Sequence, residues 1–179
     1  KGKGTRVWDA EGRVYLDFAA GIAVLSVGHC HPRVTAAIQA QSAALMHVSN
    51  LFFTEPQARL AERLSALSGF DGQCFFCNSG AEANEALFKL ARLHGRARGR
   101  FEILSMTNSF HGRTLATLAA TGQTKYQEGF EPLPAGFRQA PFNDLAAVRT
   151  AVSDKTAAIL VEAVQGEGGV VPADPAFLQ

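Results

Sequence analysis

The stretch QCFFCNSGAEANEA, residues 73–86, joins a short apolar run to a sequence that favours a helix. The run 73–77 is typical of a buried strand. Ser79, with Glu82 three residues later, forms the capping-box pattern of a helix start. We therefore expect a strand at 73–77 and a helix from Ser79 to His94, with the cysteines of the run acting as buried small hydrophobes.

The junction between this strand and helix is a candidate anion site. The first-turn amides of a helix and its dipole attract negative charge, Gly80 lets the backbone approach a ligand, and Ser79 offers a hydroxyl. The alternative is an ordinary helix cap, because Ser and Asn favour this position. Neither the GxxxxGK[ST] nor the GxGxxG spacing is present, which argues against a P-loop nucleotide-binding protein.

Downstream of this junction, strand-like and helix-like segments alternate. We expect a strand at 101–105, helices at 111–121 and 143–152, and a strand at 157–164. This alternation predicts an α/β fold with a mainly parallel central sheet and helices on both faces. The connection between Gln123 and Pro141 is long for a compact domain, so we expect it to have a binding or subunit-contact role.

Upstream, the chain begins with a predicted hairpin from Thr5 to Asp17. A loop at 28–32 leads into a helix, with Pro32 suited to its first turn. A second helix starts at Thr54, where Gln57 completes another capping-box pattern, and it ends at Gly69.

Composition limits the functional classes. The chain has 179 residues, a net charge of +1 and 47% hydrophobic residues, which predicts a globular core and gives no electrostatic argument for binding nucleic acid or a membrane surface. No apolar run reaches the roughly 18 residues of a membrane helix. Three cysteines predict a reducing, cytoplasmic setting, and no spacing indicates a metal site. The chain lacks an initiator methionine and ends in the first turn of a predicted helix, so we expect a longer protein.

Two further strand ends have chemically suggestive residues. Phe110 or His111 could give a planar cofactor a flat face, and the planar fork of Arg113 suits a carboxylate. Glu162 ends an apolar strand, where a buried carboxylate needs a partner, and the glycine-rich loop after it contains Glu167. The alternatives are a core Phe110, a solvated Arg113 and an ordinary turn with an exposed Glu167.

Four strings in this order resemble the class III, fold-type-I, pyridoxal-phosphate-dependent aminotransferases. They lie at 28–32, 78–86, 110–114 and 161–169, and together they span nearly the whole chain. Within the family, the segments 21–24, 54–57 and 121–126 are similar to the acetylornithine branch. One departure is Ala163, where the family usually has proline, and we expect it to loosen the turn after Glu162.

The resemblance implies a fold and two incomplete domains. Residues 1–45 would be the N-terminal segment of the small domain, and residues 46–179 the first part of the large cofactor-binding domain. Ser79, Gly80 and Ala81 would hold the phosphate of pyridoxal 5'-phosphate.

The resemblance also implies roles for the other two strand ends. Phe110 would stack on the pyridine ring, with His111 beside it in the cofactor site. Arg113 would bind the α-carboxylate of the substrate, and Glu162 would orient groups near the ring. Glu167 resembles a gating carboxylate that pairs with an arginine further along the family's sequence.

The implied reaction moves the terminal amino group of N-acetylornithine to 2-oxoglutarate, giving glutamate, in arginine biosynthesis by a cytoplasmic homodimer. Succinylornithine, succinyldiaminopimelate, ornithine and 4-aminobutyrate are alternative substrates. The Schiff-base lysine is expected beyond Gln179, so no catalytic residue is assigned in this chain. Lys89 follows Glu85 by four residues, which predicts a surface ion pair instead. The competing hypothesis is a catalytically incomplete fragment that binds only phosphate or a partner.

Overall fold

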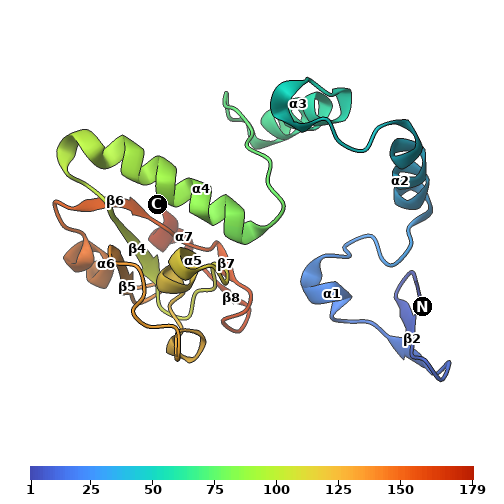
Figure 1. Cartoon of the computed structure of the whole chain (residues 1–179). Helices are drawn as coiled ribbons and strands as arrows, with labels where there is room; N and C mark the ends of the chain where they lie inside the picture. The colour runs from blue at the N-terminus through green and yellow to red at the C-terminus, as the bar shows by residue number, and fades with distance from the viewer. The chain divides into compact units, whose positions relative to one another are not determined.

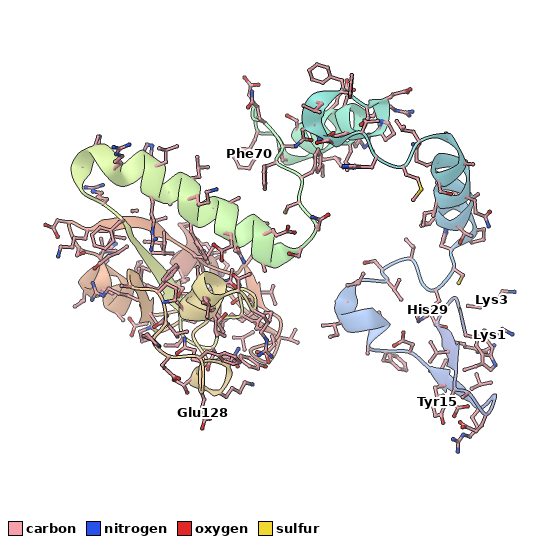
Figure 2. All side chains as sticks on the ribbon, in the orientation of Figure 1. Lys1, Lys3, Tyr15, His29, Phe70 and Glu128 are labelled. Atoms are coloured by element: carbon pink, nitrogen blue, oxygen red, sulfur yellow. The ribbon has the colours of Figure 1, made fainter.

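A computed structural model describes all residues from 1 to 179, which form two compact units, 1–70 and 71–179 (Figure 1). Phe70, marked in Figure 2, is the last residue of the first unit. The expected division of a complete protein into domains at residues 45 and 46 stays a prediction, because the two compact units describe only these 179 residues.

The first unit starts with a small antiparallel sheet. Its elements are β1 (Gly2–Lys3), β2 (Arg6–Trp8), β3 (Val14–Leu16), α1 (Ala20–Ala23), α2 (Pro32–Ala44), η1 (Ser49–Leu51) and α3 (Glu55–Ser68). Val7 pairs with Tyr15 across β2 and β3, which confirms the predicted hairpin. His29 Nε2 lies 2.6 Å from the Asp17 carboxylate, so a hydrogen bond joins the loop before α2 to the end of the hairpin.

The two predicted helices of this unit, α2 and α3, form as expected, whereas α1 and η1 were not predicted. No residue of the unit is buried. Gly69 ends α3 in the left-handed conformation with φ 69°, as the sequence indicated. The apolar stripe of α3 stays exposed, with Leu64 at 43%. Thr54 makes no side-chain hydrogen bond to α3, so the capping box predicted there does not form.

The second unit is an α/β layer structure, as predicted. Its elements are α4 (Gly80–Gly95), η2 (Arg96–Arg98), β4 (Glu102–Met106), α5 (Leu115–Ala120), η3 (Thr124–Tyr126), β5 (Phe137–Ala140), α6 (Leu145–Ala151), β6 (Thr156–Ile159), β7 (Val164–Gln165), β8 (Val171–Pro172) and α7 (Pro175–Leu178). The sheet has the order β5-β4-β6, and both pairings are parallel. The short strands β7 and β8 form a separate antiparallel pair.

The core lies on the two faces of β4, because successive side chains of a strand point to opposite sides. Ile103 packs with Phe88 of α4 and with residues of α5, whereas Leu104 packs with Val148 of α6. Phe177 of α7 covers the same face as Val148. Helices therefore cover both faces of the sheet, and Figure 1 shows α4 running along this unit.

The structure corrects four local predictions. The helix predicted at 111–121 starts only at Leu115 as α5, because Thr114 is its extended N-cap residue and the residues before it form a turn. Residues 73–77 do not form a strand, because no neighbouring strand pairs with their backbone, and most of them are exposed rather than buried. The strand predicted at 157–164 ends as β6 at Ile159. The long connection contains the unpredicted strand β5, whose four-residue sequence FRQA has little apolar character of its own.

Candidate active site

The N-terminus of α4 presents open amides. Ser79 lies outside the helix with φ −149°, and its Oγ accepts a hydrogen bond of 3.2 Å from the Glu82 amide. The Glu82 carboxylate accepts from the Asn78 amide at 2.8 Å and from the Ser79 hydroxyl, so a capping box forms. The amides of Gly80 and Ala81 have no acceptor, and the space beside Gly80 is open. Two unpaired amides at a helix N-terminus are suited to an anion.

The turn containing Gly112 packs directly against this helix start. Gly112 has φ 131°, and a Cβ atom there would lie 2.8 Å from Ala81 Cβ and 2.7 Å from Thr117 Oγ1. Contacts this short exclude any side chain, so only glycine allows the turn to approach α4. The first and second predicted junctions are therefore adjacent in space.

Two side chains of α4 tie this turn in place. Asn84 Nδ2 donates 2.8 Å to the carbonyl oxygen of His111, and Thr114 Oγ1 donates 2.5 Å to the Glu85 carboxylate. The predicted surface ion pair between Glu85 and Lys89 is absent, and Glu85 accepts the Thr114 hydrogen bond instead. Sequence reasoning gave Asn84 no role and gave Glu85 only the surface ion pair, although both lie in the string that led to the resemblance.

His111 is buried and neutral. His111 is 6% exposed, and its Nε2 atom has no hydrogen-bond partner. Its backbone N–H donates a hydrogen bond of 3.0 Å to Thr121 Oγ1. Burial lowers the pKa of His111 from 6.5 to about 4, because a charged imidazole would lose its hydration. At neutral pH the ring therefore offers an uncharged nitrogen rather than a positive charge.

Arg113 lies over two aromatic rings. Its guanidinium carbon is 4.3 Å from the centroid of Tyr126 and 5.9 Å from that of Phe110. The two rings meet edge to face, with centroids 5.7 Å apart. No carboxylate lies within ion-pair distance of Arg113. The stack thus holds a cation whose hydrogen-bond donors are available to an anionic ligand.

Two carboxylates border this stack, and their pKa values are shifted in opposite directions. Burial raises the pKa of Glu162, while the Phe110 amide lowers it and the charge of Glu167 raises it, and Oε2 of Glu162 has no partner. The carboxylate of Glu167 accepts hydrogen bonds from the Tyr126 hydroxyl and the Gln123 amide, and it lies 3.5 Å from Lys125 Nζ. The Tyr126 and Gln123 hydrogen bonds and the Lys125 charge lower the pKa of Glu167.

The loop that contains Glu167 is pinned to the end of β4. Gln165 is 2% exposed and donates from Nε2 to the Thr107 carbonyl at 2.9 Å. A Cβ atom on Gly168 would lie 2.5 Å from the Asn108 carbonyl oxygen, so the backbones are in close contact. All three predicted junctions therefore meet beyond the carboxyl end of the parallel sheet, where open α/β sheets bind ligands.

The structure assembles all the predicted site residues around one cluster in the second unit. Sequence reasoning gave the connection from Gln123 to Pro141 a general binding or subunit-contact role, but it did not single out Gln123 or Tyr126 as members of this cluster. No group of three or more histidine, cysteine, aspartate or glutamate side chains is arranged to hold a metal ion. No helix combines the length and apolar character needed to cross a membrane.

Comparisons with known proteins show the family of this chain. The family model for class-III aminotransferases matches residues 1–179. An acetylornithine aminotransferase from Myxococcus xanthus is 60% identical over 181 residues, which cover 99% of this chain and 45% of that protein. The chain therefore spans less than half the length of this relative.

Solved structures give the same result. The N-acetylornithine aminotransferase of Stenotrophomonas maltophilia K279a matches 99% of this chain and 44% of its own chain, with a TM-score of 0.82 and 39% identity. The ornithine aminotransferase of Toxoplasma gondii, whose active site is partially occupied by PLP, matches 99% of this chain and 43% of its own, with a TM-score of 0.92 and 34% identity.

Proposed function

This chain belongs to the class-III aminotransferases, and from that premise we propose that it forms part of the active site of an N-acetylornithine aminotransferase. The reaction would transfer the terminal amino group of N-acetylornithine to 2-oxoglutarate. Support comes from the 60% identity to the Myxococcus xanthus relative and from the anion-binding features of the second unit. In the complete protein we expect a cytoplasmic homodimer that serves arginine biosynthesis.

The proposed cofactor is pyridoxal 5'-phosphate, and the residues present fit it. The open amides of Gly80 and Ala81 suit a phosphate, and the ring of Phe110 suits a planar heterocycle. Buried polar atoms without partners, Nε2 of His111 and Oε2 of Glu162, suit a ligand with polar substituents. When bound, this cofactor supplies an electron-accepting ring.

Ser79 has a smaller part in this proposal than the two amides after it. Its hydroxyl donates to Glu82 and accepts from the Glu82 amide, so it already serves as the helix cap. A role in phosphate binding would require the hydroxyl proton to turn away from Glu82. We therefore assign the phosphate chiefly to Gly80 and Ala81.

The single observation that carries the proposal is the unpaired guanidinium of Arg113. A guanidinium binds a carboxylate through two parallel hydrogen bonds, which fixes both the position and the orientation of the ligand. Both N-acetylornithine and 2-oxoglutarate have an α-carboxylate that this group would hold. Phe110 and Tyr126 restrict the guanidinium, so less motion is lost when the substrate binds.

The pKa values of Glu162 and Glu167 are shifted in opposite directions in this site. The raised pKa of Glu162 makes its carboxyl group easier to protonate than an ordinary glutamate, and the protonated form would donate a hydrogen bond to a polar group of the ligand. The lowered pKa of Glu167 keeps its carboxylate charged. We propose that Glu167 controls access to an arginine elsewhere in the complete protein, and that the Schiff-base lysine also lies outside residues 1–179.

The proposal is tested on the complete protein by intact mass after incubation with pyridoxal 5'-phosphate and borohydride, followed by kinetics. We expect one covalently fixed cofactor per chain and glutamate formation from N-acetylornithine. Phosphate binding without a fixed cofactor would favour the alternative of a catalytically incomplete fragment. Faster turnover of succinylornithine, succinyldiaminopimelate, ornithine or 4-aminobutyrate would reassign the substrate.

Replacing Arg113 tests the carboxylate site. Arg113→Gln is expected to lower kcat/KM for N-acetylornithine by about 100-fold, because two charge-assisted hydrogen bonds are lost. The matched control is Arg149→Gln, which removes an exposed arginine from α6 on the other face of the sheet and should leave kcat/KM unchanged. Equal effects of the two substitutions would contradict the role of Arg113.

A further inference from the structure

Tyr126 contacts both a cation and an anion of this site. Its ring lies under the guanidinium of Arg113, with 4.3 Å from the guanidinium carbon to the ring centroid. Its hydroxyl donates a hydrogen bond to the Glu167 carboxylate. Edge-to-face packing on Phe110 fixes the ring between them. One phenol side chain therefore connects a cation and an anion that have opposite tasks.

Arg113 and Glu167 form no ion pair with each other, although both contact Tyr126. A guanidinium and a carboxylate that lie close together frequently form a bidentate pair. Here the Glu167 carboxylate is occupied by three other groups, the Tyr126 hydroxyl, the Gln123 amide and the Lys125 ammonium. We call these three residues the Glu167 dock.

Further hydrogen bonds hold the Glu167 dock in place. Gln123 Nε2 also donates to the carbonyls of Asn108 and Ser109, at 3.3 and 3.1 Å, which ties it to the turn after β4. Gln127 Nε2 donates to the carbonyls of Leu118 and Thr121, at 3.1 and 2.8 Å, which ties the end of η3 to α5. The donors that receive Glu167 are therefore in place before any substrate arrives.

We propose that Tyr126 is a positioning residue that holds Glu167 away from Arg113 and so keeps the guanidinium available for the substrate carboxylate. Without the hydroxyl, Glu167 becomes an internal competitor for the same guanidinium. This inference rests on the proposed function only for the identity of the carboxylate that Arg113 binds.

The test uses the complete, cofactor-loaded protein and four forms of it: the natural chain, Tyr126→Phe, Glu167→Gln and the double variant. Tyr126→Phe keeps the ring under Arg113 and removes only the hydroxyl. We expect KM for N-acetylornithine to rise about tenfold, the loss of one hydrogen bond to a charged group. We expect kcat to change less than twofold, because saturating substrate displaces Glu167 from Arg113.

The double variant separates competition from a merely structural effect. In the Glu167→Gln background no carboxylate competes, so adding Tyr126→Phe should leave KM unchanged. A tenfold rise in both backgrounds would overturn the proposal. Tyr15→Phe is the matched control, since Tyr15 is the other tyrosine of the chain and its hydroxyl bonds Asp9 in the first unit. Its KM should equal that of the natural chain.

A binding measurement distinguishes failure of this inference from failure of the proposed function. Pentanoate has one carboxylate and no amino group, so its calorimetric affinity reports the guanidinium without turnover. Affinity about tenfold weaker in Tyr126→Phe, but not in the double variant, would support the inference even if N-acetylornithine is not transaminated. Equal affinity in all four forms would overturn it even if the transaminase is active.

Discussion

The two units of this chain contain helices of similar length, yet only the second unit has a buried core. α3 in the first unit has 14 residues and α4 in the second has 16. Leu64 of α3 is 43% exposed, whereas Phe88 of α4 is 4% exposed. The difference lies in β4, whose two faces gather side chains from helices distant in sequence. α3 is helical without a buried face, whereas the burial of α4 depends on a strand that brings several helices together.

The site follows the same division. Every group that we assign to ligand binding lies in the second unit, where the turns after β4 are held by buried side chains and close backbone contacts. The first unit is joined mainly by exposed or half-buried polar contacts such as the pair of Asp17 and His29. Three sets of substitutions sharpen this contrast.

The largest difference is expected from shortening a leucine in each unit of the 179-residue chain. Leu104→Ala removes a 2% exposed side chain and should lower the free energy of unfolding by about 2–5 kcal/mol. Leu64→Ala removes a side chain that is already largely solvated and should change it by less than about 0.5 kcal/mol. Urea unfolding followed by far-ultraviolet circular dichroism measures both. Similar losses would mean that α3 is buried in solution.

The second difference concerns acid. His111 has a pKa of about 4 in the folded chain and 6.5 when unfolded, so the unfolded state binds more protons between these values. The stability of the second unit should fall by about 3 kcal/mol as the pH drops from 6.5 to 4. Asp17 has a lowered pKa, so its contribution to the first unit is present above 3.8 and lost only below it.

Hydrogen exchange distinguishes these two pH ranges, from 6.5 to 4 for the second unit and below 3.8 for the first. Protection of the Leu104 amide reports on the second unit, and protection of the Val7 amide reports on the hairpin of the first. His111→Gln should remove the loss of Leu104 protection between pH 6.5 and 4. If the loss persists in that variant, another group causes it.

The smallest difference compares two helix caps with the same sequence pattern. Ser79→Ala should destabilise α4 by about 1 kcal/mol, because its Oγ accepts from the Glu82 amide. Thr54→Ala should leave α3 nearly unchanged, because Thr54 makes no such bond. Amide exchange of the first turn of each helix measures the effect. A loss of equal size in both helices would show that the Thr54 cap forms in solution.

The sequence predicted the fold class and most helices because these depend on periodicity and end signals within one segment. It failed at residues 73–77, where an apolar run was assigned to a strand although no partner strand is present. It also missed β5, whose polar residues form a strand only because β4 offers an edge. Strand formation depends on a distant neighbour, and that information is not local.

The site residues divide in a similar way. Residues at strand ends, such as Phe110, Arg113 and Glu167, could be singled out because the topology of parallel sheets places such residues together. Asn84 and Tyr126 could not be singled out, because their importance lies in contacts with residues distant in sequence. Asn84 contacts His111, 27 positions away, and Tyr126 contacts Glu167, 41 positions away. The roles of all these residues in catalysis stay predictions.

The strand order β5-β4-β6 has a consequence for how the chain is made. Protein synthesis releases residues from the N-terminus at about 5–20 per second, so β4 leaves the ribosome before either of its neighbours. The helix α4, which covers one face of β4, leaves even earlier. β5 and then β6 each find a free edge of a strand that is already present. The sheet can therefore grow outward from its centre during translation, without waiting for the last residue to be added.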